Sequence, residues 1–146
     1  MSVESSSKDN SVSESKRVYE CGGLGASLRA AKIPISAAVS GAGLVFVSGL
    51  PAFDWDTGEL KVCDVPSQTR HALDNVRRAL EEANSSLDLV LKTTIYCSNV
   101  AYFQVVNDIY AEYFPSAPPA RTFVTVGSWP MKFDVEVEAI ALQRKT

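Results

Sequence analysis

Two amphipathic segments that alternate with strand-like segments constrain the fold of this 146-residue chain most. Asp64 to Asn84 carries its apolar residues at helical spacing, with Asp64 as N-cap and Pro66 in the first turn. Ala101 to Phe114 repeats the helical spacing. Only the strand-like segment Val90 to Cys97 separates the two helices. This order favours an α+β fold, a mixed β-sheet with two helices packed on one face.

The other strands are predicted by runs of β-branched and aromatic residues bounded by turn residues. They are expected at Ile33 to Val39, Leu44 to Ser48, Leu60 to Cys63, Thr122 to Gly127 and Asp134 to Gln143. The turn Gly41-Ala42-Gly43 predicts that the first two form a hairpin. Two helices on one face leave the other face of the sheet uncovered. Because that face carries apolar residues, we expect it to be buried in an oligomer.

Composition divides the chain into three parts. Residues 1–16 are Ser-rich and polar, which predicts a disordered tail. Residues 17–32 form an N-terminal extension of ambiguous pattern, in which Gly22, Gly23 and Gly25 argue against a stable helix. Residues 33–146 are expected to form one domain, since a chain of this length buries a single core.

Charge and cysteine content exclude several classes of function. The net charge is −3, and Lys and Arg are scattered among Asp and Glu, which argues against a nucleic-acid partner. No apolar stretch approaches the roughly 20 residues of a membrane span, and no signal peptide is recognised, so we expect a cytoplasmic protein. Cys21, Cys63, Cys97 and the single histidine, His71, are too few and too irregularly spaced for a metal site.

Arg121 is the only charged residue between Glu112 and Lys132, and it precedes an apolar, β-branched run. A lone guanidinium in such a setting is costly to desolvate unless an anion meets it. Its planar fork suits a carboxylate or a phosphate. Arg121 is therefore a candidate anchor for an acidic small molecule or, equally, a rim residue that caps a neighbouring acidic side chain.

Glu136 and Glu138 lie two residues apart in an alternating strand and so share one face. Same-face neighbours on a strand are about 6–7 Å apart. A partly buried carboxylate beside another has a raised pKa and can move protons or hold a water molecule. The alternative, equally compatible with this spacing, is that these glutamates form structural ion pairs across a subunit interface.

Five segments together resemble the RidA/YjgF family of enamine/imine deaminases, over residues 33 to 142. They are Pro34 to Gly49, Gln68 to Val76, Val90 to Tyr96, Val106 to Phe114 with Pro119 to Thr122, and Val135 to Ala141. The resemblance implies the YjgF/chorismate mutase-like fold and a homotrimer with sites between subunits. It also implies hydrolysis of reactive 2-enamino or 2-imino acids to 2-oxo acids and ammonia. The partner would be a small carboxylate-bearing substrate, and no cofactor or metal would take part.

The same resemblance assigns roles by position. Arg121 would bind the substrate carboxylate, Glu136 would position the attacking water, and the backbone near Phe123 would contact the carboxylate. The residues expected to line or support the pocket are Ser48, Gly49, Asn107 and Ile35. Ile35 stands where many family members have a tyrosine, which favours a different and larger acidic enamine or imine, as in the 2-aminomuconate deaminase-like branch.

Three other functions are compatible with the resemblance. A non-catalytic trimer that binds a ligand or a protein is favoured by Ile35, whereas the joint presence of Arg121 and Glu136 argues against it. Ribonuclease or translation-inhibitor activity is disfavoured by the acidic net charge. A chorismate mutase-like reaction is the most distant alternative.

Overall fold

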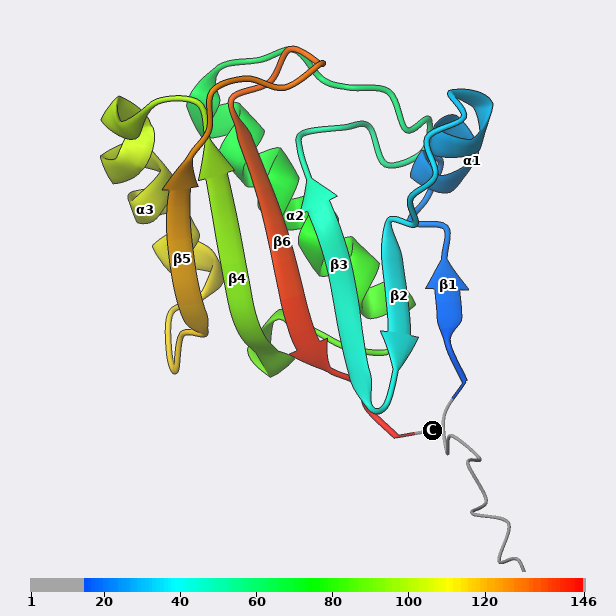
Figure 1. The fold of residues 1–146 in the computed structure, drawn as a ribbon. Coiled ribbons are helices and arrows are strands. Elements are labelled where there is room, and N and C mark those ends of the chain that lie inside the picture. Colours follow the sequence, from blue (N-terminus) through cyan, green and yellow to red (C-terminus); the bar gives the residue numbers. More distant parts are fainter. Residues whose placement is uncertain (1–14, 146) are drawn as a thin grey trace, which may run out of the picture.

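The computed structural model describes residues 15–145, which form a six-stranded sheet with two long helices on one face (Figure 1). The strands lie in the order β1-β2-β3-β6-β4-β5. Their bounds are Arg17–Tyr19 (β1), Ala38–Gly41 (β2), Leu44–Leu50 (β3), Val90–Cys97 (β4), Ala120–Thr125 (β5) and Val135–Leu142 (β6). The helices are α1 (Leu24–Ala30), α2 (Val65–Glu82) and α3 (Phe103–Tyr113), with 3-10 turns at Leu87–Leu89 and Val100–Tyr102. Residues 1–14 of the expected tail lie outside the described residues.

The connections explain why both long helices cover the same face. Strands β3 and β4 each pair antiparallel with β6, so they run in the same direction, and α2 connects them. Strand β5 is parallel to β4, and α3 connects these two. Crossovers between parallel strands are almost always right-handed, so two that step the same way along a sheet place their helices on one face. The predicted α+β architecture is confirmed.

The core lies between this helical layer and the sheet. Helix α2 begins as predicted, because the Asp64 carboxylate accepts a hydrogen bond from the Ser67 amide at 2.8 Å and Pro66 occupies the first turn. It buries Leu73, Val76 and Leu80 against the strands. Full burial of one such side chain contributes about 1.5–3 kcal/mol. Alternate residues of β6 complete this layer: Val135, Val137, Ala139 and Ala141 are buried.

The opposite face of the sheet has no helical cover among residues 15–145 (Figure 1). It carries the other residues of β6, among them Glu136, Glu138 and Ile140, and the 42% exposed Phe46 of β3. We call it the open face. No helix in the described part of the chain has the length and apolar character that a membrane span requires.

A β-bulge in β3 shapes the end of the sheet near Glu136. Val47 pairs with Ala139 and Leu50 with Val137, so β3 advances three residues while β6 advances two. Ser48 and Gly49 therefore stand opposite the single residue Glu138. A bulge bends its strand and re-aims the side chains beside it, which is common next to functional sites.

Three local predictions are corrected. Leu24–Ala30 is helical although its glycines argued otherwise. Gly22 and Gly23 serve a close approach instead: the Gly23 amide donates to the Trp55 carbonyl oxygen at 2.7 Å, and a Cβ on Gly22 would lie 2.0 Å from that oxygen.

The other two corrections concern strands. The first strand of the hairpin begins at Ala38, not at Ile33, so the residues before it are an irregular segment. Leu60 makes one isolated bridge, to Phe53, and the expected strand from Leu60 to Cys63 does not form. The hairpin turn itself is confirmed: Ala42 and Gly43 both have positive φ, as a two-residue turn that matches strand twist requires.

Candidate active site

Arg121 lies in the edge strand β5, on the side that faces α3. Its Nη2 donates a hydrogen bond to Asn107 Oδ1 of α3 at 2.8 Å. Its guanidinium carbon lies 4.8 Å from the ring centroid of Tyr110 and 5.9 Å from that of Phe103, both also on α3. Cation–π contacts of this kind, together with the amide, hold the guanidinium in place. Asn107, expected from the sequence to line or support the pocket, thus lies in direct contact with the Arg121 guanidinium.

The positive charge of Arg121 has no anionic partner within residues 15–145. The ion pairs of this part of the chain join other residues: Arg29 with Glu20, Arg70 with Glu112, Arg77 with Asp74 and Arg144 with Asp88. Arg121 therefore does not cap a carboxylate of its own described chain. A neutral amide occupies one of its donors, and the remaining donors are available to an anion from outside.

Phe123 neighbours Arg121 on the same face of β5. Its ring packs edge-on against Phe103, with centroids 5.0 Å apart and planes at 85°. Strand β5 pairs only with β4 in the described structure, so its outer backbone edge faces away from the sheet. Arg121, Asn107 and Phe123 thus form one cluster at the α3 edge, which we call the arginine cluster.

Four other predicted site residues gather around a cavity of about 260 Å³ near the end of β3. They are Ile35, Ser48, Gly49 and Glu136. Ser48 is held by two hydrogen bonds: its hydroxyl donates to the Ser36 carbonyl oxygen at 2.7 Å and its amide donates to the Ala37 carbonyl oxygen at 2.9 Å. We call this hollow the Glu136 cavity.

Glu136 is the one titratable residue that lines this cavity among the described residues. Burial raises the pKa of its carboxyl; a hydrogen bond from the Trp129 side chain opposes the rise, and the nearby Glu138 charge adds to it. Gly49 permits the approach of this carboxyl, because a Cβ on residue 49 would lie 2.7 Å from Glu136 Oε1. A half-buried carboxyl whose pKa is shifted upward is suited to proton transfer.

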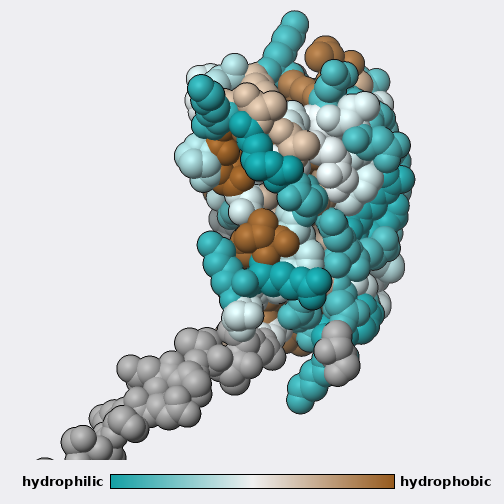
Figure 2. Space-filling view, turned by 90° about the vertical axis from the view of Figure 1, so that its right-hand side faces the viewer, coloured by the Kyte–Doolittle hydropathy of each residue, from teal (hydrophilic) through white to brown (hydrophobic). Residues whose placement is uncertain are grey.

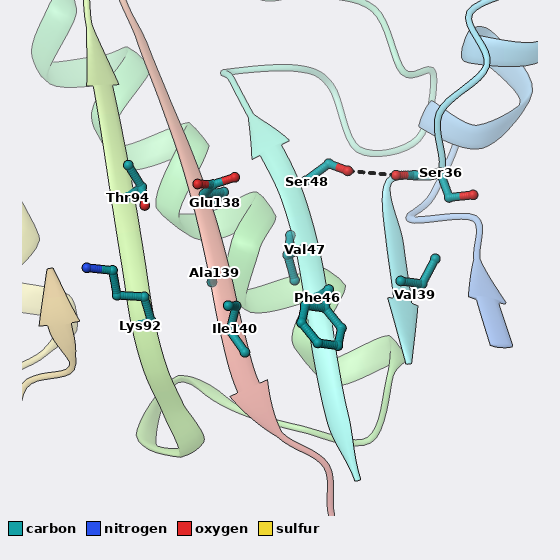
Figure 3. A pocket seen from close by; sticks show the side chains of 10 residues that line it. All are labelled: Ser36, Val39, Phe46, Val47, Ser48, Lys92, Thr94, Glu138, Ala139 and Ile140. Carbon is teal, nitrogen blue, oxygen red and sulfur yellow. Dashed lines mark hydrogen bonds between the residues drawn. The ribbon is translucent and has the colours of Figure 1, made fainter. Parts of the chain in front are cut away.

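Glu138 belongs to a different hollow, of about 280 Å³, on the open face (Figure 3). Figure 3 shows its side chain between Thr94 of β4 and Ser48 of β3, with Lys92 and Phe46 further along the strands. The Tyr96 hydroxyl donates to Glu138 Oε1 at 2.7 Å, and this bond raises the pKa of Tyr96. The two glutamates share a face, as predicted, but only Glu136 lines the Glu136 cavity.

The arginine cluster and Glu136 lie on opposite faces of the sheet. Arg121 pairs with Thr93, which in turn pairs with the buried Ala139 of β6. Glu136 pairs with Tyr96, three residues beyond Thr93. Paired residues share a face and successive residues alternate, so an offset of three reverses the side. One protomer therefore does not bring Arg121 and Glu136 into one site.

Several cavity-lining residues were not among the expected site residues, because they come from irregular or distant segments. They are Leu24 and Leu28 of α1, Phe53 and Leu60 of the loop after β3, and Trp129, Met131 and Phe133 of the turn before β6. Trp129 packs on Phe133 with ring centroids 4.4 Å apart. The Gly-Ser-Trp-Pro sequence at 127–130 was one available signal, since a tryptophan in a turn beside a functional strand can form a cleft wall.

The fold and the two residue clusters define a small α+β protein that presents a guanidinium at the β5 edge of its sheet and a carboxyl-lined cavity near the ends of the central strands β3 and β6. The family model described as endoribonuclease L-PSP matches residues 26–143. The chain belongs to this family, the RidA/YjgF family, which confirms the resemblance seen in the sequence.

Similar proteins come from all domains of life. A RutC family protein of Pyrococcus abyssi is 38% identical over 108 residues, which cover 74% of this chain and 85% of the relative. The chloroplastic Reactive Intermediate Deaminase A of Arabidopsis thaliana is also 38% identical over 108 residues, covering 74% of this chain and 58% of that protein. The crystal structure of E. coli TdcF with bound serine has 30% identity and a TM-score of 0.70, and the match covers 76% of this chain and 89% of that one.

Proposed function

We propose that this protein hydrolyses 2-imino acids, and the 2-enamino acids that tautomerise to them, to 2-oxo acids and ammonia. The observation that carries the proposal is the Glu136 carboxyl, half-buried and with a raised pKa in the wall of a cavity that a small molecule can enter. The name of the Arabidopsis relative, Reactive Intermediate Deaminase A, supports this reaction class.

Arg121 binds the substrate carboxylate in this proposal. Its guanidinium is oriented by Asn107 and Tyr110, yet it lacks an anion. A fixed guanidinium can take a carboxylate through two parallel hydrogen bonds, which also sets the orientation of the substrate. The serine bound to the related TdcF carries such a carboxylate, which supports the same class of ligand here.

Glu136 manages the water and one proton. The carbon of an iminium is electrophilic, so the enzyme has to place a water molecule and accept a proton as the C–O bond forms. The same carboxyl then gives that proton to the nitrogen, the C–N bond breaks, and a carbonyl remains. The balance is R–C(=NH₂⁺)–COO⁻ plus H₂O giving R–CO–COO⁻ plus NH₄⁺. Neither a metal nor an organic cofactor enters this sequence.

The complete site needs two copies of the chain. Since Arg121 and Glu136 lie on opposite faces of one protomer, the arginine cluster of one copy has to meet the Glu136 cavity of another. A closed ring of such heterologous contacts is a cyclic oligomer, and a homotrimer with three equivalent sites meets this requirement. The exposed apolar side chains of the open face, including Phe46 and Val124, support burial of that face in the same assembly.

A coupled assay tests the proposal directly. An amino-acid oxidase generates 2-iminopropanoate and 2-iminobutanoate in situ, and loss of each imine is followed with and without the protein. We expect acceleration by the wild type and by Arg144→Ala, which alters a surface ion pair, but not by Arg121→Ala. Loss of a charge-assisted anchor costs about 3 kcal/mol, on the order of 100-fold in kcat/KM. No acceleration by the wild type would leave the ligand-binding alternative.

Asn107 offers a second test, because it contacts the guanidinium and not the reacting carbon. Asn107→Ala removes one orienting bond and is expected to raise KM on the order of tenfold. Asn107→Asp places a carboxylate on Arg121 that competes with the substrate, so we expect a larger rise in KM for Asp than for Ala. Equal KM values for the two variants would remove Arg121 from substrate binding.

The remaining sequence-based expectations belong to this proposal as well. A cytoplasmic location, the absence of a nucleic-acid partner and the larger dicarboxylate 2-aminomuconate as an alternative substrate all stay predictions. Incubation with labelled RNA tests the second, and intact RNA is the expected result given the net charge of −3.

A further inference from the structure

The Glu136 cavity is apolar on nearly every side. Its apolar walls come from α1, from the segment before β2, from the loop after β3 and from the turn before β6. They include Leu24, Leu28, Ile33, Ile35, Leu50, Phe53, Leu60, Trp129, Met131 and Phe133. The polar groups of the side chains in its lining are those of Ser27, Ser48 and Glu136 and the indole N–H of Trp129, which bonds to Glu136. No lysine, arginine or histidine in the described chain lines it.

The rim of the cavity exposes large apolar side chains to water. Ile33 is 40% exposed, Ile35 56% and Met131 51%, and all three line this one hollow. Figure 2 faces the edge formed by β1 and α1 and shows hydrophobic patches set among hydrophilic side chains. Exposed apolar side chains that cluster around a cavity mark a surface that binds apolar groups of a ligand.

The volume suits a sizeable side chain. An apolar cavity of roughly 150 Å³ lined by Leu, Ile and Phe is large enough to hold a benzene ring. The Glu136 cavity, at about 260 Å³, has room for a branched or aromatic side chain and for the water beside Glu136. A substrate whose side chain is a single methyl group would leave most of this apolar wall in contact with water.

The charge of the cavity selects against acidic side chains. A second carboxylate on the substrate would be desolvated among apolar walls, close to the Glu136 carboxyl and without a cation in the described lining. Burial of an unpaired charge costs several kcal/mol. The single guanidinium of the proposed site is already engaged by the carboxylate next to the imine.

We propose that the Glu136 cavity holds the substrate side chain and makes this protein selective for imino acids with bulky apolar side chains, such as those derived from leucine and phenylalanine. This inference rests on the proposed deaminase function. Apolar contact replaces the hydroxyl that a tyrosine would supply at Ile35. The proposed selectivity argues against 2-aminomuconate, the larger dicarboxylate considered from the sequence.

A substrate series tests the selectivity. Imines are generated in situ from alanine, leucine, phenylalanine and glutamate by an oxidase suited to each, and kcat/KM is measured for every imine. We expect the leucine and phenylalanine imines to exceed the alanine and glutamate imines by on the order of tenfold or more, since one buried methylene is worth at least that factor. Equal values, or preference for alanine or glutamate, would overturn the inference while leaving the deaminase function intact. Failure to hydrolyse any of the four would overturn the deaminase function instead.

A variant pair assigns the selectivity to the cavity. Leu28 of α1 lines the cavity, whereas Ala26 of the same helix is exposed and does not line it. Leu28→Arg introduces a cation, so the ratio of kcat/KM for the glutamate imine over the phenylalanine imine should rise on the order of tenfold. Ala26→Arg, which adds the same charge outside the cavity, should leave this ratio at its wild-type value. An unchanged ratio in a folded Leu28→Arg protein would show that the side chain binds elsewhere.

Binding without turnover gives an independent measurement. Titration calorimetry compares three carboxylates that differ in what accompanies the carboxylate group. The compound 3-phenylpropanoate carries a phenyl group, acetate carries only a methyl group, and succinate carries a second carboxylate. We expect 3-phenylpropanoate to bind on the order of tenfold more tightly than the other two, with a negative heat-capacity change that marks burial of apolar surface. Succinate binding as tightly as 3-phenylpropanoate would contradict the inference.

Discussion

A one-to-one mixture of Arg121→Ala and Glu136→Gln subunits, exchanged by mild unfolding and refolding, is expected to regain roughly a quarter of the wild-type deaminase activity, although each variant by itself retains only on the order of 1% of it. In the proposed oligomer, each site takes its arginine from one subunit and its glutamate from the next. In a random mixture each of these residues is intact with a probability of about one half, so about a quarter of the sites are complete. Deamination of the preferred imine, measured before and after exchange, provides the readout.

This expectation follows from the sheet register. Arg121 pairs with Thr93, and Glu136 pairs with Tyr96, so their side chains leave the sheet on opposite faces. A site inside one protomer would give no regain of activity in the mixture, because every chain would lack one of the two residues. Wild-type protein treated identically is the control for refolding losses, and the double variant Arg121→Ala with Glu136→Gln, mixed with itself, sets the background activity.

Glu136→Gln is expected to lower kcat on the order of 100-fold or more while changing KM little, since general acid–base catalysis contributes factors of this size. The amide keeps the shape of the side chain but accepts no proton. Wild-type kcat/KM should fall as the pH drops through the raised pKa of Glu136, at a higher pH than for an ordinary glutamate. Residual turnover of Glu136→Gln should lose this acid limb. Wild-type activity in the variant would exclude Glu136 from the mechanism.

Glu136→Gln is also expected to change the free energy of unfolding, and the sign of this change depends on pH. Burial raises the folded-state pKa of Glu136 above its unfolded value, so the protonated form is the one that the fold favours. Its contribution to stability is present below the unfolded pKa and is lost as the pH rises through the folded pKa. Glu136→Gln should therefore be more stable than the wild type at pH 7, and this gain should vanish near pH 4, close to the unfolded pKa of glutamate.

Urea unfolding of both proteins at the two pH values measures this difference. Glu81→Gln, on the exposed surface of α2, is a control for the same loss of one negative charge away from the cavity. A Glu136→Gln protein that is less stable than the wild type at pH 7 would mean that the native carboxylate is held by favourable partners. Loss of activity with a gain of stability is the pattern expected of a residue kept for chemistry.

Local physical chemistry made much of the fold predictable from the sequence. The spacing of apolar residues along α2 and α3, the N-cap at Asp64 and the alternation in β6 depend on neighbours a few residues away, and the structure has all of them. Strand β4 was predicted at its observed bounds, Val90–Cys97, because β-branched and aromatic residues fill it. The glycines near residue 23 led to a wrong prediction, that no stable helix forms there, because their role is a contact with Trp55, far along the chain.

The candidate site, like the fold, was predictable from the sequence only in part. The sequence by itself determined which chemical groups exist: a guanidinium that lacks charged neighbours, Arg121, and a carboxyl on an alternating strand, Glu136. Only the tertiary structure decided that they lie on opposite faces, because pairing register and the bulge at Ser48 and Gly49 arise from long-range contacts. It also decided that α1 and the turn before β6 close an apolar cavity beside Glu136, since segments more than a hundred residues apart meet there only once the sheet has formed.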